Sequence, residues 1–145
     1  MQIDDTASPD RPLTPVPAAS VASLNTHDTP PFAAYWRDLD ESQQRSLVAF
    51  LTKAGLAEGR DAGSVMRSCL AYLAASPARS LLVNLEDLWL ETEPQNVPGT
   101  VDEYPNWRRK AGHGLEELAE MPSVSEALRQ VDRLRKKKAG DVGSK

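Results

Sequence analysis

The 145-residue chain has little of several features that would place it in a functional class at once. It has a single cysteine, Cys69, so an internal disulfide is impossible. No apolar run approaches the roughly 18 residues that a membrane-spanning helix needs. The N-terminal residues also lack the basic and then apolar pattern of a signal peptide. We therefore expect a cytoplasmic protein with no membrane partner.

An excess of positive charge is also missing, since the formal net charge is −4. Lys and Arg gather only near the C-terminal end, and the rest of the chain is acidic. An acidic body argues against a nucleic-acid partner. Cys69 lies on an apolar helical face and is interpreted as a small core residue. A cysteine nucleophile would need an activating histidine, and no pattern in the sequence points to one.

The composition divides the chain into one body and two ends. Residues 1–17 are acidic and rich in Pro, Ser and Thr, which predicts a disordered tail. Residues 18–138 alternate apolar runs with helical patterns and form the one predicted domain. Residues 139–145 are predicted to be a flexible tail.

The apolar patterns of the body predict an α/β fold that is largely helical. Short apolar runs at 18–25 and 80–85 predict buried strands. Helical spacing predicts helices at 32–38, 40–54, 64–75, 116–119 and 123–138, and a helical turn at 85–90. Two strands about 55 residues apart, with helices between them, are typical of a parallel βαβ unit.

Two parallel strands do not make a stable sheet alone, because each expects neighbouring strands and cover on both faces. The pattern therefore indicates the C-terminal part of a (β/α)8 barrel, whose full length is roughly 200–250 residues or more. A long polar loop follows the second strand, from about residue 90 to 109. His27 and Asp28 follow the first strand, and Pro30 and Pro31 end its ladder. Such strand ends carry the chemistry of α/β barrels.

Five segments together resemble one known family. NTHDTP at 25–30 and AYWR at 34–37 resemble a segment of the amylomaltases, the 4-α-glucanotransferases of the α-amylase superfamily. LEDL at 85–88, TEPQNVPGT at 92–100 and PNWRRK at 105–110 resemble the C-terminal signature of that family, in the same order. The resemblance covers about residues 20 to 118 and leaves the N-terminal tail outside.

The resemblance implies a (β/α)8 barrel that transfers an α-1,4-glucan segment to the 4-hydroxyl of another sugar, retaining configuration, with no cofactor or metal. Asp28 matches the third carboxylate of that superfamily, which stabilises the transition state. A carboxylate that accepts two sugar hydroxyls gains most when charge develops in the ring. His27 matches a histidine that binds the same sugar. Asn96 and Trp107 are the further candidates for binding the glucan.

Several alternatives stay open. Asn96, with Pro98 and Gly99, could simply shape a turn. Trp107 and the adjacent arginines could stack on sugar or pair with nearby carboxylates, and the ion pairs are favoured. An acid/base dyad of Glu86 and Asp87 is disfavoured, because neighbours in sequence seldom face one sugar together.

The retaining reaction needs a nucleophilic carboxylate and a carboxylic acid about 5–5.5 Å apart. In this family both come from earlier barrel strands, and residues 1–17 offer no strand context for them. Three hypotheses follow: a C-terminal fragment that is inactive alone, a subunit that completes a split barrel with a partner chain, or a non-catalytic glucan-binding module.

Overall fold

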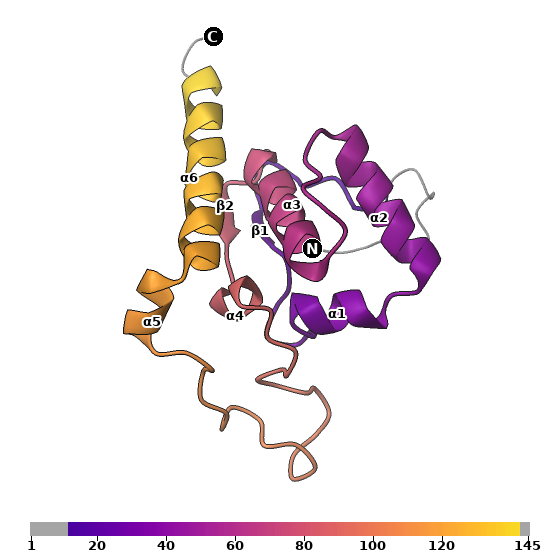
Figure 1. The fold of residues 1–145 in the computed structure, drawn as a ribbon, viewed down its shortest axis with the longest axis vertical. Coiled ribbons are helices and arrows are strands. Elements are labelled where there is room, and N and C mark those ends of the chain that lie inside the picture. Colours follow the sequence, from indigo (N-terminus) through magenta and orange to yellow (C-terminus); the bar gives the residue numbers. More distant parts are fainter. Residues whose placement is uncertain (1–11, 143–145) are drawn as a thin grey trace.

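A computed structural model describes residues 12–142, with side chains as far as residue 137. Two strands, β1 (Val21–Ser23) and β2 (Ser80–Leu82), pair in parallel and form one small sheet (Figure 1). Three helices lie between them in sequence: α1 (Phe32–Asp38), α2 (Glu41–Lys53) and α3 (Ala62–Ala75). The predicted α/β class and the parallel βαβ arrangement are confirmed.

Both strands are shorter than the predicted runs at 18–25 and 80–85. Within the described part of the chain each strand has only the other as its neighbour in the sheet, so the ladder stops where that pairing stops. After β1 the chain turns, and the side chain of Asn25 bonds to Asp87. After β2 it enters the helical turn α4 (Leu85–Leu88), as predicted.

The helix boundaries follow from capping residues that the sequence shows. Asp40 precedes α2, and its carboxylate accepts a hydrogen bond from the Gln43 N–H at 2.8 Å. The Gln43 side chain in turn accepts from the Asp40 N–H, which completes a capping box. Gly55 has a φ of 71° after the last turn of α2, a conformation that glycine adopts without strain. Asp61 caps α3, and its carboxylate accepts a hydrogen bond from the Ser64 N–H at 3.0 Å.

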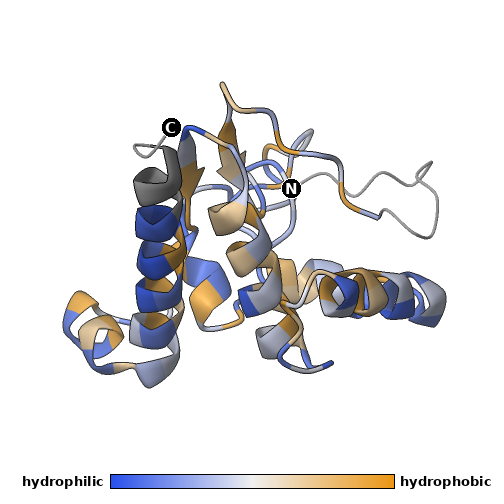
Figure 2. Ribbon diagram, turned by 90° about the horizontal axis from the view of Figure 1, so that it is seen from above, coloured by the Kyte–Doolittle hydropathy of each residue, from blue (hydrophilic) through white to orange (hydrophobic). Residues whose placement is uncertain are grey.

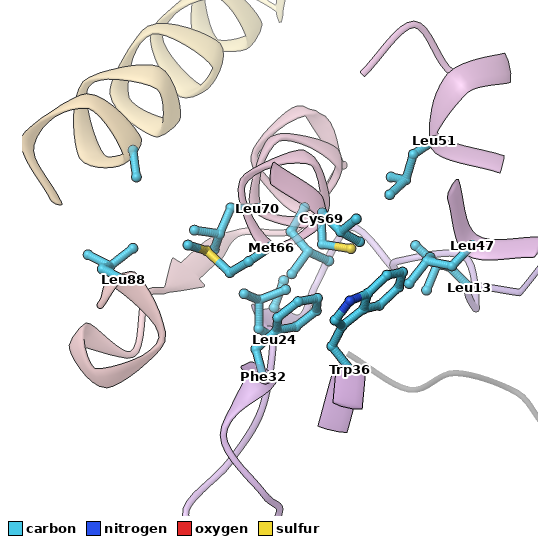
Figure 3. Packing of buried hydrophobic residues seen from close by; sticks show 14 of the residues in the cluster. Leu13, Leu24, Phe32, Trp36, Leu47, Leu51, Met66, Cys69, Leu70 and Leu88 are labelled. Carbon is cyan, nitrogen blue, oxygen red and sulfur yellow. The ribbon is translucent and has the colours of Figure 1, made fainter. Parts of the chain in front are cut away.

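The core is built around α3 and is shown in Figure 3. Met66, Cys69 and Leu70 from α3 are almost completely buried. They pack with Leu24, which directly follows β1, and with residues of α1, α2 and α4, among them Phe32, Trp36, Leu47, Leu51 and Leu88. The predicted position of Cys69 in the core is confirmed, and burial raises the pKa of its thiol to about 12.

The core also includes a residue from the segment predicted to be a tail. Leu13 is only 3% exposed and lies close to Trp36 and Leu47 (Figure 3). Val16 is partly buried against the same cluster. The composition of residues 1–17 did not predict this contact, because the segment contains few apolar residues. Two of them, Leu13 and Val16, nevertheless pack against the core. Residues 1–11 and 143–145 lie outside the described residues.

A loop from Trp89 to Gly114 leads to α5 (Leu115–Glu120) and α6 (Pro122–Val142). α6 packs along α3, and its visible side in Figure 2 is mostly hydrophilic. It runs four residues beyond the predicted end at residue 138, into the segment expected to be a flexible tail. In α6, Leu128 is 39% exposed, whereas the neighbouring Ala127 is 1% exposed.

The sheet has one covered face and one open face. Ala22 and Leu24 point into the core, whereas Val21 and Leu82 are 62% and 60% exposed. Side chains alternate between the faces of a strand, so the open face carries the set that α3 does not cover. This open face leads to the strand ends where the candidate site lies.

Candidate functional site

Two asparagines stand side by side where the strands end. The parallel register pairs Val21 with Ser80, so residues 59 positions apart lie at the same level. Asn25 and Asn84 obey this offset, and the Asn84 Nδ2 donates to the Asn25 Oδ1 at 3.1 Å. The Asn25 Nδ2 then donates to both carboxylate oxygens of Asp87, at 2.8 and 2.9 Å. This network joins β1, β2 and α4 beneath the candidate site.

His27 and Asp28 lie on the short loop between β1 and α1, and both are exposed. The loop is closed by its own threonines, because the Thr29 N–H donates to the Thr26 carbonyl at 3.2 Å and the Thr26 N–H donates to the Thr29 hydroxyl at 2.9 Å. His27 Nε2 lies 3.2 Å from the Asp28 Oδ2. The other carboxylate oxygen, Oδ1, accepts a hydrogen bond from the Asn96 Nδ2 at 2.9 Å.

Asn96 therefore reaches across from the long loop to Asp28, 68 residues away in sequence. The turn at 97–100 is held by other groups. Gly99 has a φ of 83°, and the Thr100 N–H donates to the Val97 carbonyl at 3.2 Å. Asn106 accepts from the Val97 N–H and donates to Thr100. The side-chain amide of Asn96 is therefore not needed to hold the turn and bonds to Asp28 outside the loop. Gly99 does shape the turn, through its positive φ.

Trp107 lies on the other side of His27. The two rings have centroids 5.7 Å apart at an angle of 46°. Trp107 is 61% exposed, so its ring is accessible to a ligand. Its backbone has a φ of 61°, a left-handed conformation that is costly for a residue other than glycine. A hydrogen bond from the Trp107 N–H to the Gln95 carbonyl, 2.8 Å long, holds it there.

Ion pairs between Arg109 and two glutamates tie the end of the long loop to α4 and to the start of the loop. Arg109 lies 3.0 Å from Glu86 and 2.7 Å from Glu91, and its Nη2 also donates to the Glu93 carbonyl. Partial burial favours the neutral form of Glu91, but the N–H groups of Glu93 and Thr92 and the guanidinium of Arg109 outweigh it and lower its pKa. The expected ion pairs are therefore present for Arg109, with Glu86 and Glu91, while Asp87 bonds to Asn25 instead.

Glu86 and Asp87 do not form a pair of groups open to a substrate. Glu86 is engaged by Arg109 and by the Gln95 amide, and Asp87 is 1% exposed. Burial raises the pKa of Asp87, and the hydrogen bonds from Phe32 and Asn25 offset part of that rise. The acid/base dyad that the sequence analysis disfavoured has no geometric support.

A groove of about 610 Å³ runs from the open face of the sheet to these side chains. Asp28 and Asn96 lie beside it, joined to His27, which lines it. The lining combines small and apolar strand residues with polar loop residues: Val21, Ser23, Asn25, Thr26, His27, Thr29, Pro31, Leu82, Val83, Asn84, Glu86, Pro94, Gln95 and Trp107. Such a groove, with an aromatic platform and several hydrogen-bonding groups, suits an extended polar ligand such as a glycan.

The structure thus brings together all four residues that the sequence nominated, His27, Asp28, Asn96 and Trp107. Sequence reasoning missed the residues that hold the strand ends and the loop: Asn25, Asn84, Gln95, Asn106 and Tyr104, whose hydroxyl donates to the Pro94 carbonyl at 2.6 Å. Asn25 and Asn84 lie at the same offset from the observed strand starts, but the predicted runs at 18–25 and 80–85 do not start at matching positions, so no signal in the sequence marked this pair. Among the described residues, no group of three His, Cys, Asp or Glu side chains could hold a metal ion, and no helix is long and apolar enough to cross a membrane.

Comparison with known proteins gives a consistent result. The sequence model of a family described as 4-alpha-glucanotransferase matches residues 1–114. Proteins named 4-alpha-glucanotransferase from Mycobacterium bovis (strain ATCC BAA-935 / AF2122/97) and Mycobacterium tuberculosis (strain ATCC 25618 / H37Rv) are 33% identical to this chain over 125 residues. Each alignment covers 66% of this chain and 17% of the relative, so the chain spans a small part of these relatives.

The family match begins at residue 1 rather than at about residue 20. The expectation that the N-terminal segment lies outside the resemblance was therefore wrong. Its low content of bulky apolar residues hid the relation, but the burial of Leu13 shows that part of this segment belongs to the folded body.

Proposed function

The chain belongs to the 4-alpha-glucanotransferase family, and on this premise we propose that it forms the sugar-binding end of such an enzyme, corresponding to the C-terminal part of a (β/α)8 barrel. Its ligand is an α-1,4-glucan, held in the groove beside β1 and β2. The observation that carries the proposal is the unbroken set of contacts from Trp107 through His27 and Asp28 to Asn96.

Each group has a defined task in this proposal. Asp28 accepts hydrogen bonds from sugar hydroxyls and stabilises the positive charge that develops in the ring during transfer. His27 donates to the same sugar, and Asn96 fixes the Asp28 carboxylate in the direction of the groove. Trp107 offers its exposed face to the apolar side of a neighbouring glucose ring. No cofactor or metal is required for any of these tasks.

We further propose that this chain does not transfer glucan by itself. Retaining transfer needs two further carboxylates about 5–5.5 Å apart that face the scissile bond. Within the described residues, Glu86 is ion-paired with Arg109 and Asp87 is buried, so neither can serve. The nucleophile and the acid would come from the rest of the barrel, which corresponds to the part of the relatives that this chain does not span.

Glucan binding is tested by titrating the purified chain with maltoheptaose and, as the control, with a β-1,4-linked cellodextrin. We expect saturable binding of the α-linked sugar alone. The Trp107→Ala and Asp28→Asn variants should lose it, each by roughly tenfold or more in Kd. The Val101→Ala variant, in the same loop with a side chain 80% exposed, should bind as the wild type does. Equal binding of both sugars, or unchanged binding in both site variants, would contradict the proposal.

The absence of transfer is tested separately by incubating the chain with maltotriose and measuring longer and shorter products. We expect none. Transfer by the purified chain would contradict the interpretation as an inactive fragment, but it would not contradict the proposed binding site.

A second candidate is a subunit that completes a split barrel with a partner chain. The open face of the sheet, with Val21 and Leu82 exposed, favours it, because a barrel would cover both the face and the strand edges. This candidate predicts that the chain co-purifies with a longer polypeptide and that the complex disproportionates maltotriose. If the chain binds glucan by itself and no such complex is found, the third hypothesis, a non-catalytic glucan-binding module, is favoured.

A further inference from the structure

The carboxylate of Asp87 is the most deeply buried charged group in the described part of the chain, at 1% exposure. It accepts three hydrogen bonds. The Asn25 Nδ2 donates to both of its oxygens, at 2.8 and 2.9 Å, and the Phe32 backbone N–H donates to its Oδ1 at 2.8 Å. A buried carboxylate requires such donors, because an uncompensated charge in the interior is very costly.

The two partners of Asp87 are the two ends of one loop. Asn25 is the residue just before the loop at 26–31, and Phe32 is the first residue of α1 just after it. One side chain from α4 therefore fixes both points at which that loop is attached. The loop carries His27 and Asp28, which contact each other and, through Asp28, Asn96 rather than Asp87.

The bond to Phe32 also answers a need of α1. The first N–H groups of a helix have no partner within the helix. Pro31 stands at the N-cap position and gives no side-chain hydrogen bond. Asp87 supplies the missing acceptor from another helix, so the start of α1 is placed by α4 rather than by its own capping residue.

With its ends fixed, the loop has little freedom left. Thr26 and Thr29 bond to each other across it, in both directions. The direction of the Asp28 carboxylate then depends on where Asn25 and Phe32 are held. Small displacements of a positioned group can cost as much as a hundredfold in the reaction it serves.

We propose that Asp87 is a positioning residue, which holds the loop at 26–31 through Asn25 and Phe32 so that Asp28 and His27 face the groove. The inference rests on the proposed function for the consequence to sugar binding, but its structural part stands on the hydrogen bonds alone. Asn25 transmits the constraint to β1, and the amide of Asn84 orients the Asn25 side chain in turn.

The chain offers a built-in reporter, since it has two histidines and each lies against a tryptophan. His27 is 5.7 Å from Trp107, and His113 is 5.4 Å from Trp89, centroid to centroid. Ring currents shift the imidazole proton signals of both in NMR spectra. The Trp107→Ala variant gives the position of the His27 signals without the neighbouring indole.

The experiment compares the wild type with Asp87→Asn, in which a carboxamide replaces one acceptor oxygen by a donor facing the Asn25 amide. We expect the His27 signals to move toward their positions in Trp107→Ala, while the His113 signals stay in place. The Kd for maltoheptaose should rise about tenfold to a hundredfold. The control is Asp61→Asn, the same change at the carboxylate that caps α3, which should leave His27 and the Kd unchanged.

If Asp87→Asn fails to fold, the His27 signals of Asn25→Ala report the same effect, because this change removes one attachment and leaves the bond to Phe32. Only the His27 signals are compared for this variant, because Asn25 itself lines the groove. A lowered melting temperature with unchanged His27 signals and unchanged Kd in the folded variant would overturn the inference and leave Asp87 as a structural residue only. If Asp87→Asn moves the His27 signals but the wild type binds no glucan, the positioning role is upheld and the proposed function is rejected. The two failures are therefore distinguishable.

Discussion

At the residue scale, Glu91 gives a prediction whose sign depends on pH. It is 16% exposed, bonds to Arg109, and has a lowered pKa. A carboxylate with a lowered pKa in the folded state stabilises the protein above its ordinary pKa, and this contribution is lost as the pH falls through the folded-state pKa. We expect Glu91→Gln to lower the free energy of unfolding by about 2 kcal/mol at pH 7.

That difference should begin to shrink below the ordinary pKa of 4.5, where the carboxylate of the unfolded chain takes up a proton first, and should vanish once the pH falls below the lowered pKa of the folded state and the folded carboxylate is protonated as well. Urea denaturation of both proteins at neutral pH and at low pH checks it. Glu41→Gln is the control, since Glu41 pairs with Arg45 on the surface, at 83% and 63% exposure, and such pairs contribute less than about 1 kcal/mol. A pH-independent loss in Glu91→Gln would contradict the assigned cause.

The same scale shows what the sequence could predict and what it could not. The family resemblance nominated His27, Asp28, Asn96 and Trp107, and the structure places them in contact with one another. Nothing in the LEDL segment distinguishes Glu86 from Asp87 as the inward residue. Successive residues on a helix differ by about 100° in direction, so a single turn sends one carboxylate to Arg109 and the other into the core. Only the placement of α4 decides which.

At the scale of the element, α6 buries an alanine and exposes the leucine next to it, although the leucine is the more hydrophobic residue. Ala127 is 1% exposed, while its neighbour Leu128 is 39% exposed. Ala127 lies three residues after the buried Val124, on the face that packs against α3. A small residue there lets the two helices approach closely.

We expect Ala127→Leu to destabilise the protein by about 1–3 kcal/mol, because a larger side chain has no space in that contact. Leu128→Ala, the reverse change at the next position, should alter stability by less than about 1 kcal/mol, since much of the side chain already meets water and alanine favours the helix. Thermal unfolding of the two variants side by side checks the order. A larger loss of stability in Leu128→Ala than in Ala127→Leu would contradict this packing and would mean that Leu128 is the packed residue.

Element existence was easier to predict than element extent. The helices at 32–38 and 40–54 agree closely with α1 and α2, because a proline pair and a capping aspartate mark their starts. Apolar composition alone set the predicted strands, and it cannot report where pairing stops. The long loop was also predicted, but not its path, which depends on contacts such as the Tyr104 hydroxyl donating to the Pro94 carbonyl.

At the scale of the whole molecule, the small parallel sheet has one open face. Val21 and Leu82 lie on that face, and the ladder pairs Val21 with Ser80 and Ser23 with Leu82, so the two apolar side chains are diagonal neighbours. Sequence reasoning anticipated this exposure, since two parallel strands leave edges and a face without cover. An exposed apolar sheet with free edges is also a site for unwanted association.

We therefore expect the isolated chain to bind a hydrophobic fluorescent dye and to self-associate at high concentration through this face. Replacing both Val21 and Leu82 by lysine should reduce dye fluorescence and association, while the free energy of unfolding changes by only about 0.5 kcal/mol for each exposed position. Val101→Lys is the matched control, because Val101 is 80% exposed but lies in the long loop, away from the sheet. Dye fluorescence, sedimentation velocity and denaturation of the three proteins measure these effects. If the double variant keeps the dye signal of the wild type, the face is not the apolar surface that the rest of a barrel would cover, and the partial-barrel part of the proposed function loses its physical basis.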